Sequence, residues 1–66
     1  MIAKFISETE CCLSLNVGEV NSDDMVLVWT EDAQDDLRDL SVMLKVDDVT
    51  QLIKLLEERR AQMLGD

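Results

Sequence analysis

The sequence contains no histidine, no proline and no tyrosine, and its 66 residues include only two glycines. Without histidine there is no imidazole to serve a Ser–His–Asp or Cys–His arrangement or to bind zinc. With glycine only at Gly18 and Gly65, there is no phosphate-binding glycine loop and no EF-hand calcium loop. A carboxylate pair acting as acid and base needs a desolvated cleft, for which so short a chain has little room. We therefore expect no enzymatic activity, no cofactor and no metal.

Positive charge is also scarce, because six Lys and Arg stand against fifteen Asp and Glu, for a net charge of −9. Direct binding to nucleic acid needs a basic footprint, and so does binding to an anionic membrane surface, so we expect neither. Residues 18–39 hold eight of the carboxylates and a single base, Arg38. This concentration of acid predicts a basic protein surface as the electrostatic partner.

Long apolar runs are missing as well. No stretch approaches the 18 apolar residues of a membrane-spanning helix, and the opening "MIAKFISETE" lacks the apolar core of a secretory signal. The two cysteines, Cys11 and Cys12, are adjacent, and on a strand they would point to opposite faces, so a bond between them would be strained. We interpret them as one core thiol and one exposed thiol rather than a redox pair. These features favour a reducing, cytoplasmic location.

What is present is a series of short alternating apolar segments followed by one helical pattern. The sequence predicts a single α+β domain over 1–66: a small antiparallel β-meander with one C-terminal α-helix packed on one face. The expected strands cover about 1–7, 11–17, 25–30 and 40–46, and the expected helix covers about 48–64.

The helical segment is amphipathic, with an apolar stripe of Val49, Leu52, Ile53, Leu56 and Met63. Asp47 or Asp48 is expected to cap its start, and Gly65 to follow its end. We expect Leu52 and Leu56 in the core. A role for the helix in binding a partner or in dimer formation stays open.

The third expected strand, "MVLVWT", is apolar on both faces, whereas one helix can cover only one face of a sheet. Met25, Leu27, Trp29 and Met43 would remain on the other face. Chains of fewer than about 70–80 residues usually need a disulfide, a metal, unusually good packing or a partner subunit to be stable. We therefore expect a homodimer or a higher oligomer.

The segment "NSDDMVLVWTEDAQDDLRD", residues 21–39, is the candidate binding site because it surrounds the only tryptophan with carboxylates. Aromatic residues and Met are enriched at interface centres, and charged residues form their rims. The predicted partner-binding residues are the anchors Met25 and Trp29 and the rim Asp23, Asp24, Glu31, Asp32, Asp35, Asp36 and Asp39. A simpler interpretation is also open, in which the carboxylates only keep a strand soluble and protect its edge.

These observations favour a non-enzymatic inhibitor that blocks a basic, nucleic-acid-binding type of surface on a partner protein. Such a protein would mimic the phosphate backbone, and a phage-encoded or defence-related inhibitor is the setting that its size and charge favour. The alternative is a small homo-oligomeric structural or regulatory subunit whose acidity serves solubility. A small-ligand site between subunits is a third interpretation.

Overall fold

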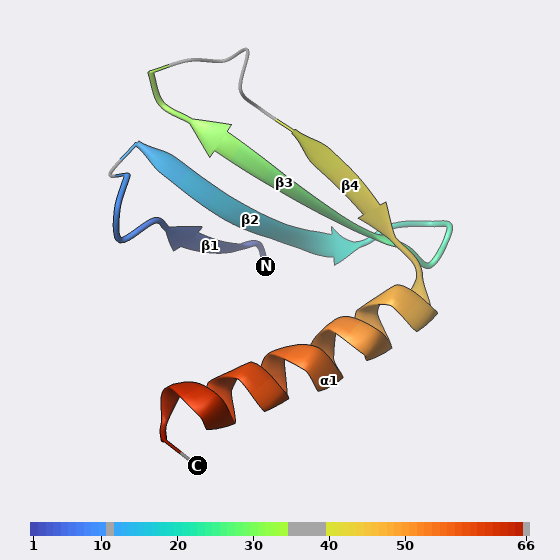
Figure 1. Ribbon diagram of the computed structural model, residues 1–66. Helices are drawn as coiled ribbons and strands as arrows, with labels where there is room; N and C mark the ends of the chain where they lie inside the picture. Colours follow the sequence, from blue (N-terminus) through green and yellow to red (C-terminus); the bar gives the residue numbers. More distant parts are fainter. Residues whose placement is uncertain (11, 35–39, 66) are drawn as a thin grey trace.

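The structure is a computed structural model that describes residues 1–10, 12–34 and 40–65 (Figure 1). Four strands, β1 (Ala3–Ile6), β2 (Leu13–Val20), β3 (Val26–Asp32) and β4 (Ser41–Leu44), form one antiparallel sheet in the order β1-β2-β3-β4. The helix α1 (Val46–Met63) follows β4. The predicted α+β fold, a meander of four strands followed by one C-terminal helix, is confirmed.

The helix begins two residues earlier than the sequence pattern predicted, and the last strand is correspondingly shorter. Lys45 occupies the N-cap position in extended conformation, and its backbone N–H donates a hydrogen bond of 3.3 Å to Asp48 Oδ2. Asp48 therefore caps the helix from its third residue and not from the N-cap position itself. At the other end Gly65 has φ +84° and its N–H donates to the Gln62 carbonyl, as expected of a glycine after a helix.

The register sorts the sheet's side chains into two faces, because directly opposed residues in antiparallel strands share a face. Val28, for example, lies opposite Val17 on one side and Val42 on the other. We call the face of the sheet that carries Val28 the apolar face. Its members are Ala3, Phe5, Leu13, Leu15, Val17, Val20, Val26, Val28, Thr30, Asp32, Val42 and Leu44. The opposite side, which we call the mixed face, carries Lys4, Ile6, Ser14, Asn16, Leu27, Trp29, Glu31, Ser41 and Met43.

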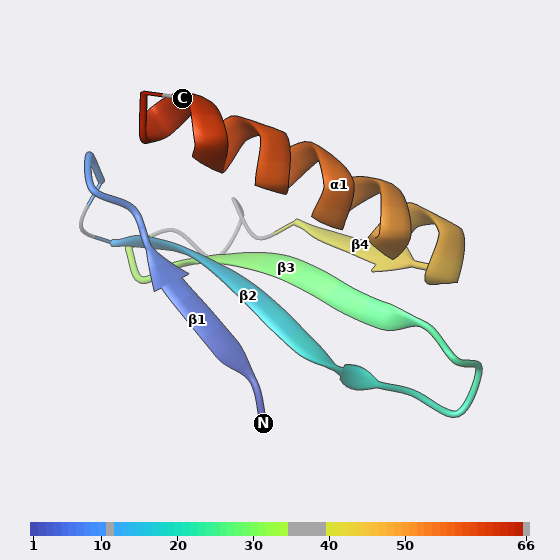
Figure 2. The same cartoon turned by 90° about the horizontal axis from the view of Figure 1, so that it is seen from below.

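Helix α1 touches the apolar face only near its start. Val46, Val49 and Thr50 line a hollow together with Asp24 of the preceding turn and with three residues of the sheet, Val20, Val26 and Leu44. From there the helix runs beside the sheet without closing onto it, as two perpendicular views show (Figures 1 and 2). Because Lys45 alone separates β4 from α1, the end of the strand sets the direction of the helix, and no loop lets the helix fold back.

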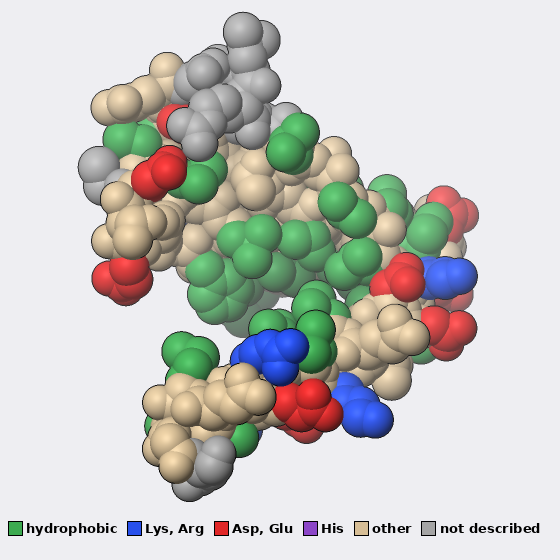
Figure 3. Space-filling model, in the orientation of Figure 1, with side chains coloured by type: hydrophobic (Ala, Val, Ile, Leu, Met, Phe, Trp, Pro, Cys, Tyr) green, Lys and Arg blue, Asp and Glu red, His purple; other side chains and the backbone are tan. Residues whose placement is uncertain are grey.

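The consequence is an open apolar cleft between α1 and the sheet. Figure 3 shows hydrophobic side chains of the sheet and of α1 facing each other across this cleft. Among the residues that the structure describes, no hydrophobic side chain is buried. Leu52 and Leu56, which the sequence placed in the core, are 41% and 57% exposed, so that prediction is wrong for the single chain.

Candidate functional site

The predicted partner-binding residues do not form one patch, because β3 separates them. Asp23 and Asp24 lie in the turn that precedes β3, whereas Glu31 and Asp32 lie at the far end of that strand. At about 3.3 Å per residue the two pairs are roughly 20 Å apart. Three further predicted residues, Asp35, Asp36 and Asp39, lie outside the described residues.

The turn between β2 and β3 is held by one side chain, that of Asn21. Its Oδ1 accepts hydrogen bonds from the N–H groups of Asp23 (2.9 Å) and Met25 (3.0 Å). The backbone of Asn21 closes the same turn, because its N–H donates to the Met25 carbonyl and its carbonyl accepts from the N–H of Asp24. The turn thus has a defined conformation before any partner arrives, and Met25 at its end is half-buried.

Asp24 adopts a left-handed backbone conformation, with φ 59°, and it is the one non-glycine residue in the described chain that does so. Asp and Asn tolerate this region better than most residues, at some cost in free energy. The side chains of Asp23 and Asp24 are exposed, and among the described residues neither carboxylate forms an ion pair. The turn therefore presents two adjacent negative charges to solvent.

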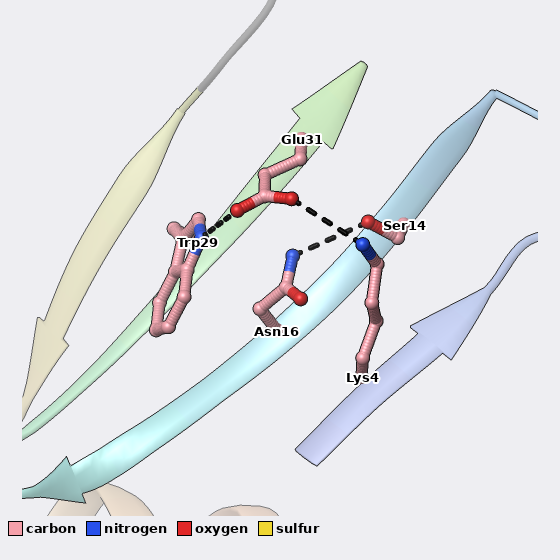
Figure 4. Close-up of polar contacts among 5 residues, drawn as sticks. All are labelled: Lys4, Ser14, Asn16, Trp29 and Glu31. Atoms are coloured by element: carbon pink, nitrogen blue, oxygen red, sulfur yellow. Dashed lines mark hydrogen bonds and ion pairs between the residues drawn. The ribbon is translucent and has the colours of Figure 1, made fainter. Parts of the chain in front are cut away.

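At the other end of β3, Trp29 and Glu31 form a polar cluster on the mixed face (Figure 4). The indole Nε1–H of Trp29 donates a hydrogen bond of 2.9 Å to Glu31 Oε1, and Lys4 Nζ lies 3.5 Å from Glu31 Oε2. Beside them on β2, Asn16 Nδ2 donates to Ser14 Oγ at 3.3 Å, and both of these side chains are buried.

The position of the Trp29 indole depends partly on the absence of a side chain at Gly18. A Cβ added at Gly18 would lie 3.2 Å from Trp29 Cζ3 and 3.3 Å from the Leu27 carbonyl oxygen. The ring therefore lies against the β2 backbone, next to the register shift between Val17 and Val20. Trp29 is held over the sheet by this close approach and by the hydrogen bond to Glu31, and it is half-exposed. A shallow hollow beside it is lined by Leu27, Leu40 and Ser41.

The two carboxylates at this end of β3 differ in environment. The hydrogen bond from Trp29 and the nearby ammonium of Lys4 hold the pKa of Glu31 below its ordinary value, against the opposing effect of desolvation. Asp32 lies on the apolar face opposite Leu13, is only 6% exposed, and accepts a hydrogen bond of 2.9 Å from the N–H of Gln34. Its carboxylate therefore has a structural role in the chain, whereas Glu31 remains accessible to a partner.

Within residues 1–10, 12–34 and 40–65, no group of three or more Cys, Asp or Glu side chains is placed to hold a metal ion. Over the same residues, α1 is too polar to cross a membrane. What remains is an acidic turn, an oriented tryptophan with its glutamate, and the apolar cleft.

Sequence reasoning missed the cleft, although it had identified both of its walls. The alternation in each strand and the stripe on the helix were interpreted as two halves of a closed core. The signal that pointed to an open arrangement was the short connection at Lys45, since a helix that starts one residue after a strand has little freedom to fold back.

Comparison with protein-family models, with curated proteins and with solved structures finds no match. The function is therefore argued from the residues and their geometry.

Proposed function

We propose that the protein is a non-enzymatic, acidic interaction module that binds and blocks a basic surface on a partner protein. The observation that carries this proposal is the turn at residues 21–25, where Asp23 and Asp24 stand exposed on a backbone fixed by Asn21. Charges held on an ordered turn lose little conformational freedom on binding. They also add to the field of a chain with net charge −9, which attracts a basic surface from a distance.

Trp29 supplies the second element of the proposed binding site. Its ring is already oriented by Gly18 and Glu31, so little side-chain entropy is lost when a partner covers it. Tryptophan is among the residues that most often dominate binding energy at interfaces. We place the partner against the mixed face and the acidic turn, with Met25 between them and with Asp35, Asp36 and Asp39 as further predicted rim residues.

The basic surface is proposed to be of the nucleic-acid-binding type, because such surfaces are built to attract dense negative charge. The protein would then act inside the cell as a mimic of the phosphate backbone. A phage-encoded or defence-related inhibitor remains the setting that this size and charge favour.

The test begins with affinity capture of the partner from the source cell and its identification by mass spectrometry. Binding is then measured by surface plasmon resonance against rising salt, for the parent and for the double variant Asp23→Asn, Asp24→Asn. Asn tolerates the left-handed conformation, so the change removes charge and preserves the turn. We expect association with the partner to slow as salt rises, and the double variant to associate several-fold more slowly than the parent.

The matched control is the double variant Glu57→Gln, Glu58→Gln, which removes the same charge from the exposed surface of α1. It should bind nearly as the parent does. A competition assay adds the inhibitory step, because the parent should displace duplex DNA or RNA from the partner. Binding that is unaffected by salt and by the Asp23 and Asp24 changes would contradict the proposal.

A second candidate function is favoured by the apolar cleft. A chain that leaves its hydrophobic residues exposed fits a small homo-oligomeric structural or regulatory subunit, in which the carboxylates keep the assembly soluble. The two candidates differ in what the acidic turn does, and the double Asn variant separates them.

A further inference from the structure

The single chain exposes more surface than a folded monomer of its size should. Its accessible area is 5670 Å² for a mass of 7.5 kDa. The scaling of surface with mass gives about 4,200 Å² for a folded monomer of that mass, so the excess is roughly 1,400 Å². A standard interface buries about 800 Å² on each partner. The excess area is therefore sufficient for one complete interface.

The dimensions of the molecule agree with this excess. Its radius of gyration is 13.7 Å, and its principal extents are 37 × 34 × 19 Å. A compact domain of this length is expected to have a radius of gyration of about 11 Å. The chain is thus extended and flat, because α1 diverges from the sheet and leaves the cleft between them open (Figure 3).

The walls of the cleft are apolar on both sides. One wall is the apolar face of the sheet, where Phe5 is 59% and Leu15 is 45% exposed. The other is the stripe of α1, where Ile53 is 53% and Leu56 is 57% exposed. Asp32 is the only ionisable residue among the described members of the apolar face, and it is buried. The walls are therefore mainly apolar. Asp24 lines the hollow at the start of α1, and Arg60, four residues after Leu56, lies in line with the stripe.

We propose that the cleft is the interface of a homodimer, in which a second copy of this chain covers the apolar face and the helix stripe. While the cleft is open, no hydrophobic side chain of the described chain is buried. The folded chain therefore needs a partner in the cleft at all times. A second copy is the one partner that is always present at matched concentration. In a two-fold contact both copies use the same surface, so the apolar surface of each copy covers that of the other.

This assembly does not rest on the proposed function. The dimer uses the apolar face and α1, whereas the proposed partner site uses the mixed face and the acidic turn. It also differs from the oligomer predicted from the sequence, which placed Met25, Leu27, Trp29 and Met43 at the contact. Apart from Asp24, which lines the hollow at the start of α1, the two surfaces lie on opposite sides of the sheet, so variants on the two faces can separate them.

The first measurement is the mass of the full chain by sedimentation equilibrium at about 1 µM to 100 µM. We expect a species of twice the 7.5 kDa of one chain. A mass of one chain throughout this range would overturn the proposal, as would a species that keeps growing with concentration, because a two-fold contact closes on itself.

Paired variants then locate the interface. Leu56→Lys places a charge in the stripe, whereas Leu55→Lys changes the neighbouring residue, which lies about 100° round the helix from the centre of the stripe. On the sheet, Leu15→Lys changes the apolar face and Leu27→Lys changes the mixed face. We expect Leu56→Lys and Leu15→Lys to shift the dimer to monomer or unfolded chain, and their controls to remain dimeric. Dissociation by the controls alone would overturn the assignment.

A measurement on the unchanged chain covers the case in which the stripe and apolar-face variants do not fold. Hydroxyl-radical footprinting at low and high concentration compares Phe5 on the apolar face with Met43 on the mixed face, both of which are exposed in the single chain. We expect Phe5 to become protected as concentration rises and Met43 to react equally at both. Protection of Met43 alone, or of neither, would contradict the proposed interface.

Discussion

At the scale of single residues, Trp29 and Glu31 show how a side chain can be fixed although no hydrophobic residue in the described part of the chain is buried. The indole is placed by the absence of a side chain at Gly18 and by one hydrogen bond, of 2.9 Å, to Glu31 Oε1. Both interactions come from the sheet alone, so the orientation does not depend on α1. The proposed binding surface on the mixed face therefore has an aromatic residue that is ordered in advance.

The protonation state of Glu31 should change the fluorescence of Trp29, which is the only tryptophan in the sequence. The hydrogen bond from the indole lowers the pKa of Glu31 in the folded state. A lowered pKa means that the ionised form stabilises the fold above the unfolded-state pKa, and that this contribution is lost as pH falls through the folded value. We expect the emission of Trp29 to change with a midpoint below the ordinary pKa of glutamate.

The control for this titration is Glu31→Gln, which should remove the transition, while Glu8→Gln on an exposed site should leave it in place. A midpoint at or above the ordinary value for glutamate, or a transition that survives Glu31→Gln, would show that another carboxylate controls the indole.

At the scale of elements, the turn before β3 combines a stabilising side chain with a strained residue. Asn21 satisfies two backbone N–H groups, and Asp24 holds φ 59°. Glycine at position 24 would adopt that conformation without the steric cost of a Cβ. We expect Asp24→Gly to stabilise the fold by about 0.5–1 kcal/mol, which corresponds to a rise of a few degrees in melting temperature.

Asp23→Gly is the matched control, because it removes the same charge at a residue without a positive φ. It should be neutral or destabilising, since glycine there only adds freedom to the unfolded chain. If both glycine variants melt at the same higher temperature, charge repulsion and not backbone strain explains the gain. Thermal melts followed by circular dichroism distinguish the two cases.

The elements themselves were predictable because each carries a local pattern. The alternation of Leu13, Leu15 and Val17 matches their common face in β2, and Gly65 marks the end of α1 as expected. The placement of α1 was not predictable in the same way. An apolar stripe shows that a helix face will be covered, but it does not show whether the cover comes from its own chain or from another.

For the candidate binding site, the sequence predicted individual residues but not their arrangement. Asp23, Asp24 and Trp29 were identified by composition alone, and the structure places all three at exposed or half-exposed positions. Asp32 was grouped with them because charge along the sequence does not reveal which face of a strand a residue occupies. The register puts it on the apolar face opposite Leu13, where it is buried.

At the scale of the whole molecule, charge and apolar surface are partly separated. The cleft is lined by hydrophobic side chains, while the exposed carboxylates of the turn lie at its outer end, near Lys45 and Val46. A dimer closed through the cleft would carry twice the net charge of −9. Its mixed faces would remain outside, so each copy could still present Trp29 and Glu31 to a partner.

If folding requires the second copy, then stability must depend on protein concentration. For a chain that folds only as a dimer, a hundredfold rise in concentration adds about 2.7 kcal/mol to the stability of the assembly. With the unfolding entropy expected for two chains of this length, that corresponds to an increase of roughly 10 °C in melting temperature. Circular dichroism melts at about 1 µM and about 100 µM measure it directly.

The melting temperature of Leu55→Lys should rise with concentration in the same way, because this change leaves the stripe of α1 intact. The parent at high salt should also show this rise, because the cleft is mainly apolar. A melting temperature that is constant over the hundredfold range would mean that one chain folds without its copy. Helix α1 would then have to be stable in water with its apolar stripe exposed. An isolated helix of 18 residues is only marginally stable under those conditions.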